Sequence, residues 1–96
     1  MFRMKKIFDN DLTTIIKIEG QIPDNESNNW SAEISSLIKQ SERQVILEMC
    51  DVTFISAKAV QVMMDELTDK VFLLNCPTFV KNMLQSAGLS AHVLDA

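Results

Sequence analysis

The sequence is poor in the residue types that most often build catalytic and cofactor sites. Its 96 residues include two glycines, one histidine and no tyrosine. With so few glycines there is no glycine-rich loop of the kind that holds a phosphate. His92 stands alone, without the Cys/His cluster that a zinc site needs. We therefore expect neither a metal ion nor another cofactor.

Long hydrophobic runs and an excess of positive charge are missing too. No stretch approaches the ~18–20 apolar residues of a membrane span. At the start, acidic Asp9 and Asp11 follow only two apolar residues after Lys6, far short of a signal-peptide core. The net charge is -4 and the basic residues are scattered, which disfavours nucleic-acid binding. The sequence predicts a cytoplasmic protein without direct membrane insertion, whose two cysteines, Cys50 and Cys76, are reduced thiols.

What the chain does contain is a regular alternation of strand and helix patterns. A hydrophobic content of 47% in 96 residues predicts a single domain, residues 1–96, with one core. We expect strands at 2–8, 13–19, 44–49 and 71–75, and helices near 27–41, 57–68 and 77–87, with a polar loop over 21–29.

This order predicts an α/β fold with a mixed sheet of about four strands and about three helices. The first two strands form an N-terminal hairpin through the Asp9-Asn10-Asp11 turn. The later strands alternate with helices, so right-handed crossovers should pair them in parallel. The run QVILEM is short and apolar, as in a central strand covered on both faces.

Apolar residues at helical spacing predict the buried side of each helix. The expected inner faces are Trp30, Ile34, Leu37 and Ile38 in the first helix, Val60, Met63, Met64 and Leu67 in the second, and Phe79, Val80, Met83, Leu84 and Ala87 in the third. Gly88 follows as a C′ residue, the position where a helix commonly ends in a left-handed conformation.

Ser56 stands where the third strand gives way to the second helix. This position favours an N-cap, whose hydroxyl accepts a hydrogen bond from the backbone NH of Ala59 or Lys58. A nucleophilic serine at such a turn would need flanking glycines and a nearby base. Because both are missing, serine-hydrolase chemistry is not expected.

Cys76 is the other candidate for chemistry, because the Cys76-Pro77 pair precedes the last helix. The NH groups of a helix N-terminus favour a thiolate over a thiol. Cysteine beside a buried apolar strand is also a common small core residue. We favour the core role and keep a reactive Cys76 thiol as the alternative.

The order of the elements, together with VILEMCDVTFISAKAV, VFLLNCP and MLQSAGL, resembles the STAS domain. This is the fold of anti-sigma factor antagonists and of sulfate-transporter tails, and the resemblance extends from about Lys5 to Leu94. The matching segments are Val45-Ile46-Leu47 for the central strand, Val52-Thr53-Phe54-Ile55 before the signature, and Asn75, Pro77 and Gly88-Leu89 around the last helix.

The family signature is degenerate in this chain. Bacterial regulators of the family usually read Asp-Ser-Ser-Gly-Leu at this point, and a partner kinase phosphorylates the first serine. Without a gap, Ser56 falls on the aspartate, Ala57 on that serine, Lys58 on the second serine, Ala59 on the glycine and Val60 on the leucine. A one-residue gap would align Ser56 with the phosphorylated serine, but it would put small Ala59 where the helix needs its first large apolar residue.

The resemblance implies a non-enzymatic regulatory module, similar to an anti-sigma factor antagonist, that binds a protein partner through Ser56, Ala57, Lys58 and Ala59. The implied partner is an anti-sigma factor or a serine kinase of the histidine-kinase-like ATPase fold. Because Ala57 has no hydroxyl, we expect no regulation by phosphorylation there. The helix N-terminus and Lys58 favour an anion or carboxylate on the partner. The alternative function is a small thiol or sulfur-carrier protein acting through Cys76.

Overall fold

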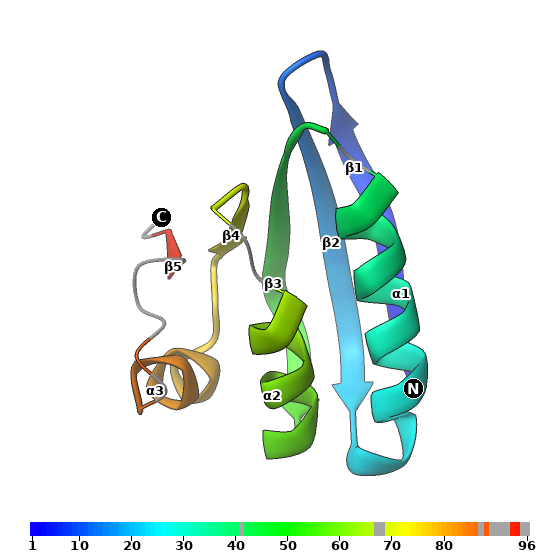
Figure 1. Ribbon diagram of the computed structural model, residues 1–96. Helices are drawn as coiled ribbons and strands as arrows, with labels where there is room; N and C mark the ends of the chain where they lie inside the picture. Colours follow the sequence, from blue (N-terminus) through cyan, green and yellow to red (C-terminus); the bar gives the residue numbers. More distant parts are fainter. Residues whose placement is uncertain (41, 67–68, 87, 89–92, 95–96) are drawn as a thin grey trace.

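A computed structural model describes residues 1–40, 42–66, 69–86, 88 and 93–94. The elements in chain order are β1 (Phe2–Asp9), β2 (Thr13–Ile22), the 3-10 turn η1 (Asp24–Glu26), α1 (Ser27–Gln40), β3 (Gln44–Ile55), α2 (Ala57–Glu66), β4 (Val71–Leu74), α3 (Thr78–Ser86) and β5 (Val93–Leu94) (Figure 1). The predictions for Leu67, Ala87, Leu89 and His92 lie outside the described residues.

The described strands form one mixed sheet in the order β1-β2-β3-β4-β5. Strand β1 pairs antiparallel with β2, which confirms the N-terminal hairpin, and Asn10 Oδ1 accepts the backbone NH groups of Leu12 and Thr13 in its turn. The pairs β2–β3 and β3–β4 are parallel, as predicted. The expected count of about four strands rises to five among the described residues, because the two-residue β5 pairs with β4.

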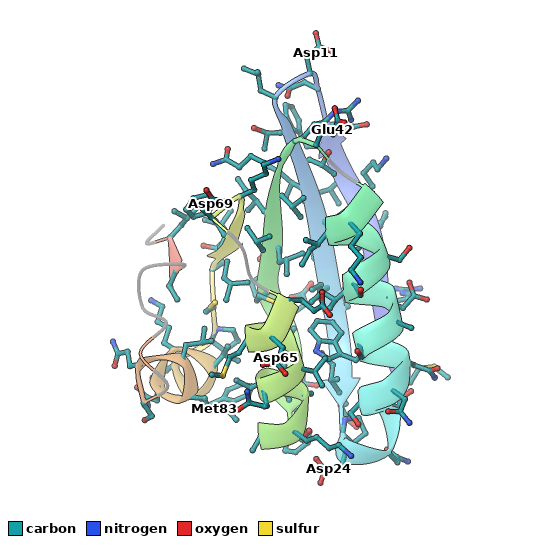
Figure 2. All side chains as sticks on the ribbon, viewed as in Figure 1. Asp11, Asp24, Glu42, Asp65, Asp69 and Met83 are labelled. Carbon is teal, nitrogen blue, oxygen red and sulfur yellow. The ribbon has the colours of Figure 1, made fainter. Side chains whose placement is uncertain are left out.

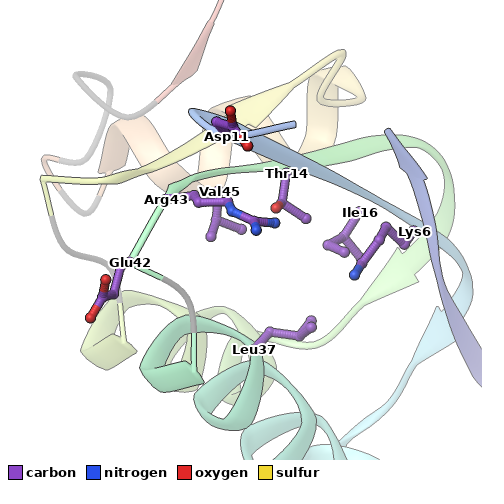
Figure 3. A pocket seen from close by; sticks show the side chains of 8 residues that line it. All are labelled: Lys6, Asp11, Thr14, Ile16, Leu37, Glu42, Arg43 and Val45. Atoms are coloured by element: carbon purple, nitrogen blue, oxygen red, sulfur yellow. The ribbon is translucent and has the colours of Figure 1, made fainter. Parts of the chain in front are cut away.

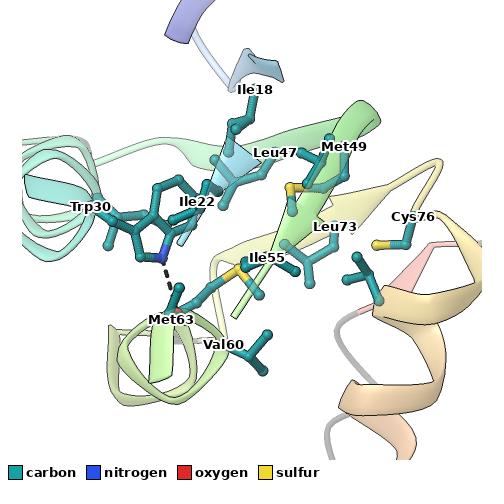
Figure 4. Close-up of a cluster of buried hydrophobic side chains, with 14 of the residues drawn as sticks. Ile18, Ile22, Trp30, Leu47, Met49, Ile55, Val60, Met63, Leu73 and Cys76 are labelled. Atoms are coloured by element: carbon teal, nitrogen blue, oxygen red, sulfur yellow. Dashed lines mark hydrogen bonds between the residues drawn. The ribbon is translucent and has the colours of Figure 1, made fainter. Parts of the chain in front are cut away.

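The described helices α1, α2 and α3 all lie on one face of the sheet (Figures 1 and 4). Each successive parallel strand is added on the same side of its predecessor, so right-handed crossovers bring every helix to the same face. Along β2, Ile16 and Ile18 are buried beneath the helices while Ile15 and Lys17 on the other side are half-buried. The prediction that residues 44–49 are covered on both faces is therefore wrong. We call the side that carries Ile15, Lys17, Ile46 and Glu48 the open face.

The core lies between the sheet and the helices, with Trp30 at its α1 side and Cys76 at its α3 side (Figure 4). The Trp30 side chain is fully buried, and its indole Nε1–H donates to the carbonyl oxygen of Ala59 at 3.0 Å. The ring of Phe2 meets it edge to face, with centroids 5.4 Å apart. The predicted inner faces are confirmed for the buried residues Ile34, Val60, Met63, Val80 and Leu84. The prediction is wrong for Phe79, which lies at the start of α3 and is 38% exposed.

Several element boundaries differ from the predicted ones. Strand β2 continues through Gly20 to Ile22, so little of the predicted loop over 21–29 remains. The start of α1 at Ser27 agrees with the predicted helix near 27–41. Gly20 has φ +99°, and a Cβ there would stand 2.5 Å from the carbonyl oxygen of Met1, so only glycine fits between β1 and β2 at this point. Gly88 has the positive φ, +78°, that its predicted C′ position requires.

The Trp30 hydrogen bond yields a stability prediction. Trp30→Phe keeps an aromatic ring in the core but removes the N–H donor and part of the ring volume. We expect it to lower the free energy of unfolding by about 1–3 kcal/mol. Urea unfolding followed by circular dichroism measures the change, with Phe2→Leu as a control that keeps the bond to Ala59. An unchanged midpoint in Trp30→Phe would show that the bond adds nothing to stability.

Candidate functional site

The junction between β3 and α2 is fixed by backbone hydrogen bonds. The Ser56 NH donates to the carbonyl oxygen of Ile22 at the end of β2, at 2.9 Å. The Ser56 hydroxyl oxygen accepts the NH of Ala59 at 3.0 Å, and the Ser56 carbonyl accepts the NH of Val60 at 3.0 Å. The predicted N-cap is thus confirmed, with Ala59 as the donor. Such a cap contributes about 1 kcal/mol to the stability of its helix.

The predicted site residues divide into two pairs. Ser56 is 8% exposed and Ala59 is fully buried, with its carbonyl bonded to Trp30. Ala57 and Lys58 are exposed on the first turn of α2. Only the second pair is therefore accessible to another molecule, and the first pair holds that turn in place.

Phe54 is a surface residue at this junction that the sequence did not reveal. Val52 and Ile55 are both buried although they are three residues apart, which a regular alternating strand does not allow. The pairing of β3 with β2 shifts at this point, where Gly20 lies opposite Val52 and Gln21 opposite Phe54. The irregularity turns Phe54 outward, 48% exposed, two residues before Ser56. No local pattern of apolar residues signals such a shift.

Cys76 is a core residue in the structure. It is 7% exposed and belongs to the hydrophobic cluster (Figure 4). Burial raises the pKa of its thiol to about 11, which outweighs the opposite effect of nearby Lys81. The helix begins only at Thr78, after Pro77, whose carbonyl accepts the NH groups of Val80 and Lys81. These features favour the thiol over the thiolate.

Cys50 is exposed on the open face, but the pKa of its thiol is no lower than that of Cys76. Its Sγ–H donates to Glu48 Oε2 at 3.3 Å, and this hydrogen bond, with burial and the charges of Glu48 and Asp51, raises the pKa of the thiol to about 11. Among the described residues, no group of three or more His, Cys, Asp or Glu side chains could hold a metal ion.

A hollow of about 610 Å³ lies at the opposite end of the sheet from the start of α2 (Figure 3). Its lining residues are Lys6, Asp11, Thr14, Ile16, Leu37, Glu42, Arg43 and Val45. The basic side chains Lys6 and Arg43 both pair with Asp9, which also accepts the Thr14 hydroxyl at 2.8 Å. The Thr14 bond and the Arg43 contact lower the pKa of Asp9 below its ordinary value. The positive charges of the hollow are thus already matched by a carboxylate, which disfavours an anion site.

The geometry defines a class of protein: a mixed sheet with helices on one face and a capped helix starting at the carboxyl end of a central parallel strand. The STAS domain family model matches residues 4–94, so the chain belongs to the STAS domain family. No curated protein matches the sequence at a significant level. In the described part of the chain, every helix is too short or too polar to span a membrane.

Solved structures share this fold at low sequence identity. The anti-sigma factor antagonist SpoIIAA in its unphosphorylated form has 23% identity and a TM-score of 0.72, covering 100% of this chain and 88% of that one. The phosphorylated form of SpoIIAA, a Bacillus cell fate determinant, has 18% identity and a TM-score of 0.68, with 100% and 91% coverage. An anti-sigma factor antagonist from Mycobacterium paratuberculosis has 11% identity and a TM-score of 0.77, with 99% and 85% coverage.

The raised pKa of Cys76 predicts slow alkylation. A thiol with a pKa of about 11 holds roughly a hundredfold less thiolate at pH 7 than an ordinary cysteine, and the thiolate is the reacting form. Iodoacetamide should therefore modify Cys76 at least a hundredfold more slowly in the folded protein than in the same protein unfolded by guanidinium. Mass spectrometry of the digested protein follows each cysteine separately. Faster reaction in the folded state would contradict this prediction and support a reactive thiol at Cys76.

Proposed function

We propose that this chain is a non-enzymatic regulatory module that works in the cytoplasm as a single domain, in the manner of an anti-sigma factor antagonist. Its docking surface consists of Phe54, Ala57 and Lys58, held in place by Ser56 and Ala59. Membership of the STAS family and the structural likeness to SpoIIAA support this function. The observation that carries it is the exposed first turn of α2, which is fixed by the Ser56 cap and by Trp30.

The charge of this surface suits an acidic partner. The NH groups at the start of α2 carry partial positive charge, and Lys58 adds a full one. Figure 2 shows Asp11, Glu42 and Asp69 at the opposite end of the sheet, where β2, β3 and β4 begin, although Asp24 lies at the same end as the start of α2. Exposed Phe54 supplies the apolar contact that aromatic residues often make at the centre of an interface.

The partner we propose is an anti-sigma factor or a serine kinase of the histidine-kinase-like ATPase fold. Such a partner would present a carboxylate or a bound nucleotide phosphate to the start of α2, where an anion is stabilised. Affinity capture from the source cell followed by mass spectrometry identifies it. A small thiol or sulfur-carrier function through Cys76 is the weaker alternative, because the thiol is buried and its pKa is raised.

We predict that the cognate kinase does not phosphorylate this junction. Ala57 has no hydroxyl, and the Ser56 hydroxyl is buried and bonded to the backbone of α2. After incubation with ATP and the kinase that the capture experiment identifies, the intact mass should stay unchanged. A known substrate of the same kinase is the positive control. One added phosphate located on Ser56 would contradict this prediction and favour the gapped alignment.

Lys58→Glu should separate binding from stability. A reversed charge at a close contact weakens binding by about 1–3 kcal/mol, roughly fivefold to 150-fold. The same carboxylate in the first turn of α2 stabilises the helix by roughly 0.3–1 kcal/mol. Isothermal titration against the captured partner and a thermal melt measure the two effects.

Lys39→Glu is the matched control for this substitution. It makes the same change in net charge in the last turn of α1, at an exposed position outside the proposed docking surface. We expect it to leave the affinity within about twofold of the unmodified protein, a change well below one tenfold step. Equal losses in the two variants would move the interface away from the start of α2.

A further inference from the structure

An apolar row crosses the open face of the sheet. Cross-strand pairing places Phe8 opposite Ile15, Ile15 opposite Ile46, and Ile46 opposite Phe72, so the row spans four adjacent strands from β1 to β4. Paired residues project from the same side of a sheet, and Ile15 is on the side away from the helices. Phe8 is 47% exposed and the other three are half-buried. The described helices all lie on the other face of the sheet (Figure 1).

The next row along the strands is charged, and its charges are ordered. It runs from Lys5 on β1 through Lys17 on β2 to Glu48 on β3 and Leu74 on β4. Lys17 also pairs with Asp51 at 2.9 Å, and Glu48, which is 8% exposed, also accepts the backbone NH of Cys50 at 2.8 Å. Positive charge thus lies on the β1 side of the sheet's centre and negative charge on the β3 side. On the other side of the apolar row, Thr13 and Gln44 form a polar pair through a 3.3 Å hydrogen bond.

We propose that the open face binds a second copy of this chain in a two-fold symmetric dimer. A two-fold axis parallel to the strands, between β2 and β3, lays β2 of one copy over β3 of the other and β1 over β4. Ile15 then meets Ile46 of the second copy, and Phe8 meets its Phe72.

The charged row fits the same arrangement. Lys17 lies opposite Glu48 of the second copy, and each such contact occurs twice because of the symmetry. The stem of Lys5 covers Leu74 of the second copy, as lysine stems do on apolar surfaces. When the two sheets face each other, the apolar row of one copy therefore meets the apolar row of the other. In the charged rows, the positive end of each meets the negative end of the other.

The small area of the open face predicts a weak, reversible dimer. Strands β1, β2, β3 and β4 have 8, 10, 12 and 4 residues. At about 4.8 Å between strands and about 3.3 Å per residue, they make a face of roughly 500 Å² per copy. A standard stable interface buries roughly 800 Å² per partner. The contact is of the small, transient class, and it leaves the helix face of both copies uncovered. The proposal does not depend on the proposed function, because the docking surface lies at the ends of the strands.

Sedimentation equilibrium over a range of protein concentrations tests the dimer. We expect a reversible monomer–dimer equilibrium that Phe8→Ser weakens at least tenfold, since the substitution removes two apolar contacts at once. Phe79→Ser is the matched control, because Phe79 is 38% exposed on α3, away from the open face, and should leave the equilibrium unchanged. A protein that stays monomeric at every concentration, or equal effects of both substitutions, would overturn the proposal.

A charge exchange tests the pairing of β2 with β3. Lys17→Glu and Glu48→Lys should each abolish self-association, because like charges then face each other across the axis. Mixed in equal amounts, the two variants should associate with each other, since every contact between positions 17 and 48 across the axis again joins a carboxylate to an ammonium group. Circular dichroism confirms that each variant is folded. Folded variants that fail to associate on mixing, or that each still self-associate, would show that this arrangement is wrong.

Discussion

The indole N–H of Trp30 is the polar group on which the rest of the structure depends. It is fully buried, and a buried donor without an acceptor would cost several kcal/mol, so α1 and α2 must pack where the Ala59 carbonyl can receive it. This bond fixes the first turn of α2 from the side of α1, while the Ser56 NH fixes it from the end of β2. The exposed side chains of Ala57 and Lys58 are thus presented by a turn that is ordered before any partner arrives.

Local patterns predicted the parts of the fold that local physics decides. The cap at Ser56, the hairpin turn at Asn10 and the buried sides of the helices depend on residues within a few positions of one another. The uncovered face of the sheet depends instead on the order in which strands are added, so the composition of QVILEM alone was misleading. The exposure of Phe54 could not be predicted because it follows from an irregular pairing between β2 and β3. Strand β5 could not be predicted because two residues are too few to show an alternating pattern.

The two faces of the sheet have separate physical roles. The helix face is buried under α1, α2 and α3, and Cys76 is an ordinary core residue there, with a raised pKa. The open face is amphipathic, with an apolar row beside a charged one, and its Lys17–Asp51 ion pair of 2.9 Å raises the pKa of the lysine and lowers that of the aspartate. Both groups therefore stay charged across the neutral range.

Ala57 has no hydroxyl and that of Ser56 is buried, so under the proposed function we expect no control by a phosphate at this junction. In a junction with a free serine, a phosphate adds about two negative charges beside the partner's own acidic groups and repels them. Here Lys58 keeps the start of α2 positive at all times. In the proposed dimer, a two-fold axis parallel to the strands places both proposed docking surfaces at the same end, because both copies of β3 then run in the same direction. A partner that is itself dimeric would engage both surfaces, with an effective concentration for the second contact that can reach the millimolar range. Under these two proposals the occupancy of the partner would rise steeply with the concentration of this chain, and assembly would take the place of phosphorylation as the means of control.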